Sequence, residues 1–214
     1  ETSYANGGQL SASNAEVWNS AITVLKGMKW MFKSGAPLLL NPKPSWHKYS
    51  WLAEFVAAIP KYRENTIQTV QWALEARDHL RSIAAEEGIN FDREERGILH
   101  FYGSKAEFDT AAKVTGLLAQ GGLERRAVTP TEIAEIEPTL EGDIYGGFFT
   151  DSDFTGDIHK FTMGLARACV RRGAFLRFGA KVEKLRAEAG QVFVTESTTK
   201  HSFDAIVVSA GIHS

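Results

Sequence analysis

The sequence holds a single cysteine, Cys169, among its 214 residues. No disulfide can form within the chain, so the composition favours a reducing compartment, and we expect a cytoplasmic protein. No apolar run approaches the roughly 20 residues that a membrane-spanning helix needs. Neither sign of charge dominates, because 24 Lys and Arg stand against 26 Asp and Glu. This balance argues against a nucleic-acid partner, which usually selects a concentrated basic face.

Several motifs that mark catalytic or metal sites are also missing. The sequence contains no H-E-x-x-H, no C-x-x-C and no G-x-S-x-G, and its six histidines are scattered. We therefore predict no metal site and no catalytic acid, base or nucleophile. Asp151, Asp153 and Asp157 lie close together, but Thr162 occupies the position at which a calcium loop needs Glu. We favour a turn followed by a helix that Asp157 caps.

Hydrophobic periodicity and the positions of Gly and Pro divide the rest of the chain into helices and strands. In Glu64–Glu87, apolar side chains at helical spacing share one arc, and Gly88 stands where a C-terminal cap is expected. Similar signals predict helices over Ala21–Lys33, Trp46–Ile59, Lys105–Gln120 and Asp157–Arg172, and a short one between Thr129 and Pro138. Strands are predicted at Gly97–Tyr102, Leu123–Val128, Ile144–Thr150, Phe175–Phe178, Lys181–Leu185, Gln191–Thr195 and Phe203–Ser209, with Ser197–Ser202 as a polar separator. Together these elements indicate a mixed α/β (α+β) chain.

The opening loop has the composition of a cofactor-contact segment. Thr2, Ser3, Asn6, Gly7 and Gly8 combine hydroxyl groups with glycines. Glycine lets a backbone approach a phosphate or a flat ring closely. The alternative is a surface turn, since Asn-Gly is a common turn dipeptide.

A second candidate loop lies near the other end of the sequence. The continuous apolar run Ala205–Val208 predicts a strand covered on both faces. Ser209, Ala210 and Gly211 follow at its carboxyl end, where α/β sheets place ligands. The alternative is a tight turn after a core strand.

An aromatic group occurs in the predicted helix after residue 45. Trp46, Tyr49, Trp51 and Phe55 have two interpretations, since they could wall a pocket beside a flat cofactor or pack in the core. Cys169 falls on the apolar stripe of the predicted helix Asp157–Arg172, which favours a buried thiol over a nucleophile.

Taken in order along the chain, seven segments resemble those of the D-amino acid dehydrogenase branch of the D-amino acid oxidase-like flavoprotein family. They are ETSYANGGQLSAS, LKGMKWMF, APLLL, GGFFTDSDFTGDIHKFT, GLARACVRRGAFLRF, KVEKL and DAIVVSAGIHS. The resemblance implies an FAD-contact loop at 1–14 and a substrate-binding domain at 15–156, with a mixed or antiparallel sheet and long helices. It also implies part of a Rossmann-like FAD domain at 157–214, with a helix, a strand, a meander and a final strand.

The resemblance further implies an FAD enzyme that oxidises a D-amino acid to a 2-oxo acid and ammonia. Electrons would pass to a quinone or another acceptor, and the family allows peripheral association with the inner membrane. The residues carried over by position are Thr2, Ser3, Asn6, Gly7 and Gly8 near FAD, Val182 at its adenosine end, Ala210 and Gly211 at its pyrophosphate, and Tyr49 and Trp51 on the substrate side.

The sequence also departs from this family. It contains no G-x-G-x-x-G, the motif that holds the pyrophosphate at a helix N-terminus. We therefore interpret the chain as an internal segment that, alone, binds FAD weakly or not at all. Two alternatives stay open: another amine-oxidising flavoenzyme of the family, of glycine, sarcosine or D-proline type, and a non-catalytic folded module.

Overall fold

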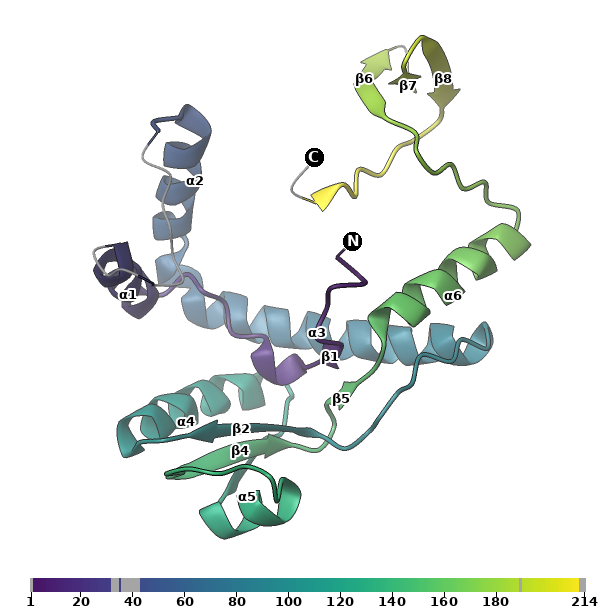
Figure 1. Cartoon of the computed structure of the whole chain (residues 1–214). Coiled ribbons are helices and arrows are strands. Elements are labelled where there is room, and N and C mark those ends of the chain that lie inside the picture. The colour runs from purple at the N-terminus through teal and green to yellow at the C-terminus, as the bar shows by residue number, and fades with distance from the viewer. Residues whose placement is uncertain (1, 32–34, 36–42, 189, 212–214) are drawn as a thin grey trace. The chain divides into compact units, whose positions relative to one another are not determined.

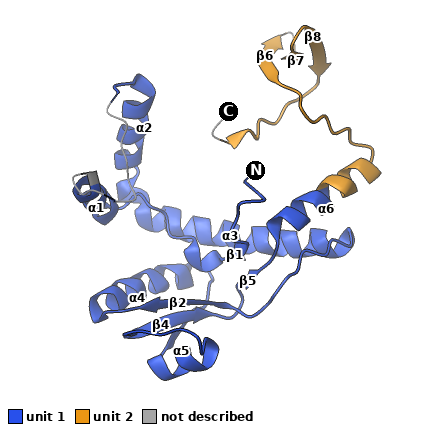
Figure 2. Ribbon diagram, viewed as in Figure 1, with its two compact units in different colours: residues 1–165 blue, residues 166–214 orange. Residues whose placement is uncertain are grey.

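The computed structural model describes residues 2–31, 35, 43–188 and 190–211 (Figure 1). The chain divides into two compact units, residues 1–165 and residues 166–214 (Figure 2). A division by compactness assigns no role to either unit. The functional boundaries predicted at 14/15 and 156/157 therefore stay predictions.

The first unit is built on a three-stranded antiparallel sheet, as the sequence predicts. Its strands, in the order β2-β4-β3, are Ile98–Tyr102, Gly146–Thr150 and Arg126–Val128. All five residues of β4 are buried, because it is the central strand and both of its faces are covered.

Two helices cover the opposite faces of this sheet, α4 (Lys105–Gln120) and α5 (Pro130–Ile136) (Figure 1). Successive side chains of a strand point to opposite faces. Accordingly, Phe148 stacks on Phe108 of α4 with ring centroids 4.8 Å apart, whereas Phe149 joins a buried cluster with Ile133 of α5. Thr129 and Glu132 form the capping box that starts α5.

The long helix α3 (Tyr62–Glu86) packs on α4 and confirms the amphipathic pattern predicted for Glu64–Glu87. Val70 and Leu118 are fully buried where the two helices meet. A Cβ at Gly121, just after α4, would lie 2.6 Å from Cβ of Val70. The absence of a side chain there lets the end of α4 approach α3 closely.

The remaining elements of the first unit lie around these layers. They are β1 (Gln9–Leu10), the 3-10 helices η1 (Ala12–Asn14) and η2 (Ile59–Lys61), α1 (Ala21–Met31), α2 (Trp46–Ala57), β5 (Phe154–Thr155) and the start of α6 (Ile158–Arg171). The last two residues of the predicted helix Ala21–Lys33 lie outside the described residues. Asp157 caps α6 as predicted, because its Oδ1 accepts a hydrogen bond from Lys160 N at 2.9 Å. No helix among the described residues has the length and apolarity needed to cross a bilayer.

The second unit contains an antiparallel meander, in the order β6-β7-β8. Its strands are Val182–Glu188, Gln191–Glu196 and Thr199–Phe203. The first two confirm the predicted strands. The third corrects the interpretation of Ser197–Ser202 as a separator, since only Ser197 and Thr198 form the turn. Polar residues form this strand because it pairs along its whole length with β7.

Three further predictions for this part of the chain are wrong. Phe175–Phe178 and Ala205–Val208 form no strand, and Phe175 and Val207 are 96% and 86% exposed. A strand needs a partner for its backbone groups, and no strand among the described residues pairs with either run. Cys169 is exposed, because it lies about 100° around α6 from the buried Ala168.

Replacing the buried Leu118 by alanine tests the packing of α3 on α4. We expect Leu118→Ala to lower the free energy of unfolding by about 2–5 kcal/mol, through lost burial and the cavity left behind. Leu25→Ala, on another helix but 56% exposed, is the matched control and should cost under about 1 kcal/mol. Urea unfolding of both variants measures this, and equal losses would contradict the described core.

Candidate functional site

The loop that carries the first predicted cofactor contacts is held at its C-terminal end by the fold. Asn6 Oδ1 accepts a hydrogen bond from Gly8 N at 2.8 Å. Gly8 O accepts one from Gly156 N at 2.9 Å, and β1 then pairs with β5. Gly8 has a positive φ of 65°, and a Cβ there would lie 2.3 Å from Gly156 O. Glycine at position 8 is therefore required by the contact between these two backbones.

Gly7, one residue earlier, has different surroundings. A Cβ at Gly7 would have no atom within 4 Å, so the backbone there is open. Thr2 and Asn6 are exposed and Ser3 is half-buried. The loop thus presents an open backbone and polar side chains beside an anchored end, which fits the close approach of a flat or phosphate-bearing ligand.

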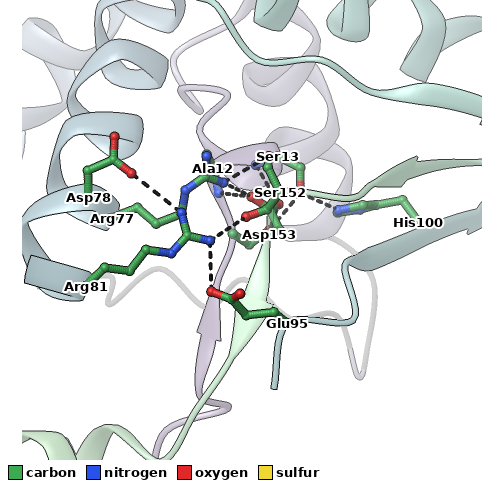
Figure 3. Close-up of polar contacts among 10 residues, drawn as sticks. Ala12, Ser13, Arg77, Asp78, Arg81, Glu95, His100, Ser152 and Asp153 are labelled. Atoms are coloured by element: carbon green, nitrogen blue, oxygen red, sulfur yellow. Dashed lines mark hydrogen bonds and ion pairs between the residues drawn. The ribbon is translucent and has the colours of Figure 1, made fainter. Parts of the chain in front are cut away.

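The segment after β1 is held by a buried carboxylate, Asp153. Its side chain is fully buried and accepts hydrogen bonds from Ala12 N at 3.0 Å, Ser13 N at 3.1 Å and Ser11 Oγ at 3.1 Å (Figure 3). Arg77 of α3 pairs with it, with Nη1 2.9 Å from Oδ1. The carboxylate therefore joins η1, α3 and the turn before β5 in one polar cluster.

A second arginine lies one turn further along α3. Arg81 Nη2 is 3.2 Å from a carboxylate oxygen of Glu95, and its Nη1 is 3.5 Å from one of Asp78 (Figure 3). Its guanidinium stands over the ring of Phe154, 4.7 Å from the centroid. Arg77 thus holds α3 against the turn that carries Asp153, and Arg81 holds it against the segment before β2 that carries Glu95.

His100 of β2 extends the cluster on the other side of η1. Its Nε2 lies 2.9 Å from Ser13 Oγ (Figure 3). Burial lowers the pKa of His100 below its usual value, the positive charge of Arg125 lowers this pKa further, and Asp153 partly opposes the shift. His100 is therefore an uncharged hydrogen-bonding group at neutral pH.

A cavity of about 570 Å³ opens beside this cluster. Ser13 and Asn14 of η1, His100 and Tyr102 of β2, and Arg125 are among its lining residues. Polar groups that converge in a space of this size are typical of small-molecule sites. No cluster of His, Cys, Asp and Glu with the geometry of a metal site occurs among the described residues.

The other predicted site residues are not among those that line this cavity. Tyr49 and Trp51 are on α2, 52% and 55% exposed, and neither lines the cavity. Val182 opens β6 and is 54% exposed. Ala210 and Gly211 follow β8 as exposed residues of the second unit. The roles assigned to these five residues stay predictions.

The residues that organise the site are not among those that the sequence predicts for it. The sequence shows Asp153 only as one of three nearby aspartates, whereas Arg77 and Ala12, its partners, are 76 and 141 residues away in sequence. His100 and Arg125 likewise belong to no motif. No local pattern marks such partners, because folding alone brings them together.

The Asp153 cluster is open to a direct test. Asp153→Asn removes the charge, leaves Arg77 buried and unpaired, and should lower the free energy of unfolding by about 3–5 kcal/mol. Asp151→Asn is the control, since Asp151 is 73% exposed and its ion pair with Arg126 spans 3.7 Å; its cost should stay within about 1 kcal/mol. Chemical denaturation measures the free energy of unfolding of both variants. Equal values would show that the Asp153 carboxylate does not hold η1 and α3 together.

The lowered pKa of His100 predicts a pH dependence. Between the ordinary pKa of 6.5 and the lower folded value, the unfolded chain binds more protons at this residue than the folded chain. The free energy of unfolding should therefore fall as pH drops through that window. His100→Gln should flatten the slope, whereas His79→Gln, at an exposed position, should keep it. Denaturation across pH 5–8 measures how the free energy of unfolding of both variants depends on pH. An unchanged dependence in His100→Gln would refute the lowered pKa of His100.

Comparisons with known proteins place this geometry in context. The family model "DAO: FAD dependent oxidoreductase" matches residues 1–214. The chain is 57% identical to D-amino acid dehydrogenase 3 of Mesorhizobium japonicum over 100% of its own length and 53% of that protein. It is 37% identical to D-amino acid dehydrogenase of Paramagnetospirillum magneticum over 90% of the chain and 47% of that protein. It thus spans about half the length of these relatives.

Solved structures share the fold. Glycine oxidase from Geobacillus kaustophilus superposes with a TM-score of 0.67 at 18% identity, over 98% of this chain and 45% of that one. L-proline dehydrogenase from P. horikoshii gives 0.56 at 19% identity, over 62% and 35%. The mixed helical and antiparallel fold is therefore confirmed. Since the family match covers every residue, the chain belongs to the DAO family of FAD dependent oxidoreductases.

Proposed function

We propose that this chain forms part of an enzyme that oxidises D-amino acids to 2-oxo acids and ammonia with FAD as cofactor. The observation that carries the proposal is the 57% identity to D-amino acid dehydrogenase 3, which extends over the whole chain. Identity at this level over 100% of the chain favours a shared substrate class over a shared fold alone.

The residues proposed to hold FAD fit such a group. Thr2, Ser3 and Asn6 offer polar groups on an accessible loop, and the open backbone at Gly7 permits close approach. Gly8 contributes by anchoring the loop to Gly156. In the second unit, Val182, Ala210 and Gly211 have exposed positions suited to backbone contacts.

When bound, FAD supplies the oxidising power that removes hydride from the substrate Cα. The protein's task is to bind and orient the substrate. Asp153 holds η1 in place, and η1 carries Ser13, whose hydroxyl contacts the uncharged His100. These groups form a rigid polar wall that can orient an amino acid without adding a titrating charge at neutral pH. Water then converts the imino acid into the 2-oxo acid and ammonia.

The electron acceptor is part of the proposal. The relatives are named dehydrogenases, which favours transfer to a quinone or another acceptor over direct reaction with oxygen. A quinone acceptor would require the enzyme to reach a membrane, so we propose a cytoplasmic enzyme that associates peripherally with the inner membrane. Tyr49 and Trp51, both exposed on α2, stay proposed contacts on the substrate side.

Substrate assays of the FAD-loaded holoenzyme test this function. We expect D-amino acids to bleach the flavin absorbance anaerobically and to drive reduction of a quinone or dye, with release of ammonia. The matched L-enantiomers are the controls and should leave the flavin oxidised. Glycine, sarcosine and D-proline complete the panel. Turnover confined to one of these three, or faster turnover with oxygen than with the dye, would contradict the proposal.

A further inference from the structure

One stretch of the first unit carries charge of a single sign. Residues 17–53, called here the basic segment, contain five lysines and neither Asp nor Glu. The whole chain, by contrast, has 24 Lys and Arg against 26 Asp and Glu. The basic segment includes α1 and most of α2, and both helices belong to the first unit (Figure 2). Positive charge gathered in this way attracts an anionic partner.

Helix α1 exposes its apolar side chains together with its charge. Ile22, Leu25 and Met28 share one arc of the helix and are 60%, 56% and 45% exposed. At 100° per residue, Lys29 lies on the same arc, between Leu25 and Ile22. Gly27, on the opposite arc, is half-buried. The face of α1 that points away from the protein is therefore both apolar and basic.

Tryptophans in both helices extend this surface. Trp46, the first residue of α2, is 85% exposed, and Trp30 of α1 is 38% exposed. None of the twelve residues of α2, all of which the structure describes, is buried. Large apolar side chains that gather at an exposed surface mark a contact with a partner.

The combination of side chains in the basic segment favours a lipid surface as that partner. Tryptophan lies at the level of the lipid headgroups, and lysine binds anionic headgroups. A second copy of the chain fits poorly, because a two-fold interface would bring the same lysines of both copies together. An acidic protein would match the charge, but lysine is depleted in interfaces between proteins.

We propose that the basic segment binds the surface of a bilayer that contains anionic lipids. The exposed arc of α1 and the indole of Trp46 enter the headgroup region, and Lys29 binds the anionic headgroups. This inference rests on the peripheral membrane association in the proposed function. It adds the surface that makes the contact and the charge of the lipid.

Vesicle binding by the FAD-loaded holoenzyme tests the charge requirement without turnover. Vesicles with equal parts of phosphatidylglycerol and phosphatidylcholine should bind it roughly tenfold more tightly than pure phosphatidylcholine vesicles. NaCl at about 0.5 M should remove most of this difference by screening. Lys29→Gln should raise the Kd for the anionic vesicles about fivefold. Lys113→Gln, at an exposed position of α4, is the matched control and should keep the wild-type Kd.

Quenching by brominated lipids tests which side chains enter the bilayer. Bromine quenches an indole only at close range, so anionic vesicles of brominated lipid should reduce the tryptophan emission of the bound holoenzyme. Trp46→Phe should lose part of this quenching, because its indole would lie among the headgroups. Trp72→Phe is the matched control and should keep it, since Trp72 is 62% exposed but lies on α3.

Several outcomes would overturn the surface. They are equal binding to anionic and neutral vesicles, equal losses in the Lys29 and Lys113 variants, and full quenching in Trp46→Phe. A dimer that Trp46→Ser dissociates, in a holoenzyme that leaves vesicles unbound, would assign the surface to a second copy instead. Oxidation of D-amino acids with a dye but without vesicle binding contradicts the surface alone, whereas vesicle binding without such oxidation contradicts the proposed reaction alone.

Discussion

The buried carboxylate of Asp153 is the contact on which the arrangement of the first unit depends. Its two oxygens receive backbone N–H groups from η1 and the guanidinium of Arg77 from α3. A charge in the interior is tolerated only with such complete pairing. Because η1 is the C-terminal end of the predicted cofactor loop at 1–14, the same carboxylate holds that end of the loop on the first unit.

The central strand β4 connects the Asp153 cluster to the cavity. It begins with Gly146 and Gly147, continues with two phenylalanines and leads to the turn that carries Asp153. The glycines let α4, α5 and the neighbouring backbone come close, since a Cβ at Gly147 would lie 2.6 Å from His100 O. Tight pairing of β4 with β2 then places His100 beside η1. Strand β4 therefore determines both how closely the helices pack on the sheet and where His100 lies.

Local signals predicted the elements whose ends are set by neighbouring residues. Lys105–Gln120 matches α4 at both ends, and the box formed by Thr129 and Glu132 begins α5 as its spacing indicates. The wrong predictions concern segments whose structure depends on pairing with another strand. Ala205–Val208 has the composition of a buried strand, yet no described strand lies beside it, whereas the polar strand Thr199–Phe203 forms because β7 offers a partner.

By itself, the sequence determined the mixed fold, the presence and approximate extent of the helices and the resemblance to a flavoenzyme family, because these follow from periodicity, caps and the order of local segments. The tertiary structure decided that Gly8 serves the backbone contact with Gly156, that Asp153 holds η1 and α3 together instead of lying at the surface, and that Nε and Nη2 of Arg125 are buried without a hydrogen-bond partner among the described residues. Each of these depends on groups brought together from distant parts of the chain. The order of residues in the chain does not state which distant groups come into contact, so only the folded structure reveals these contacts.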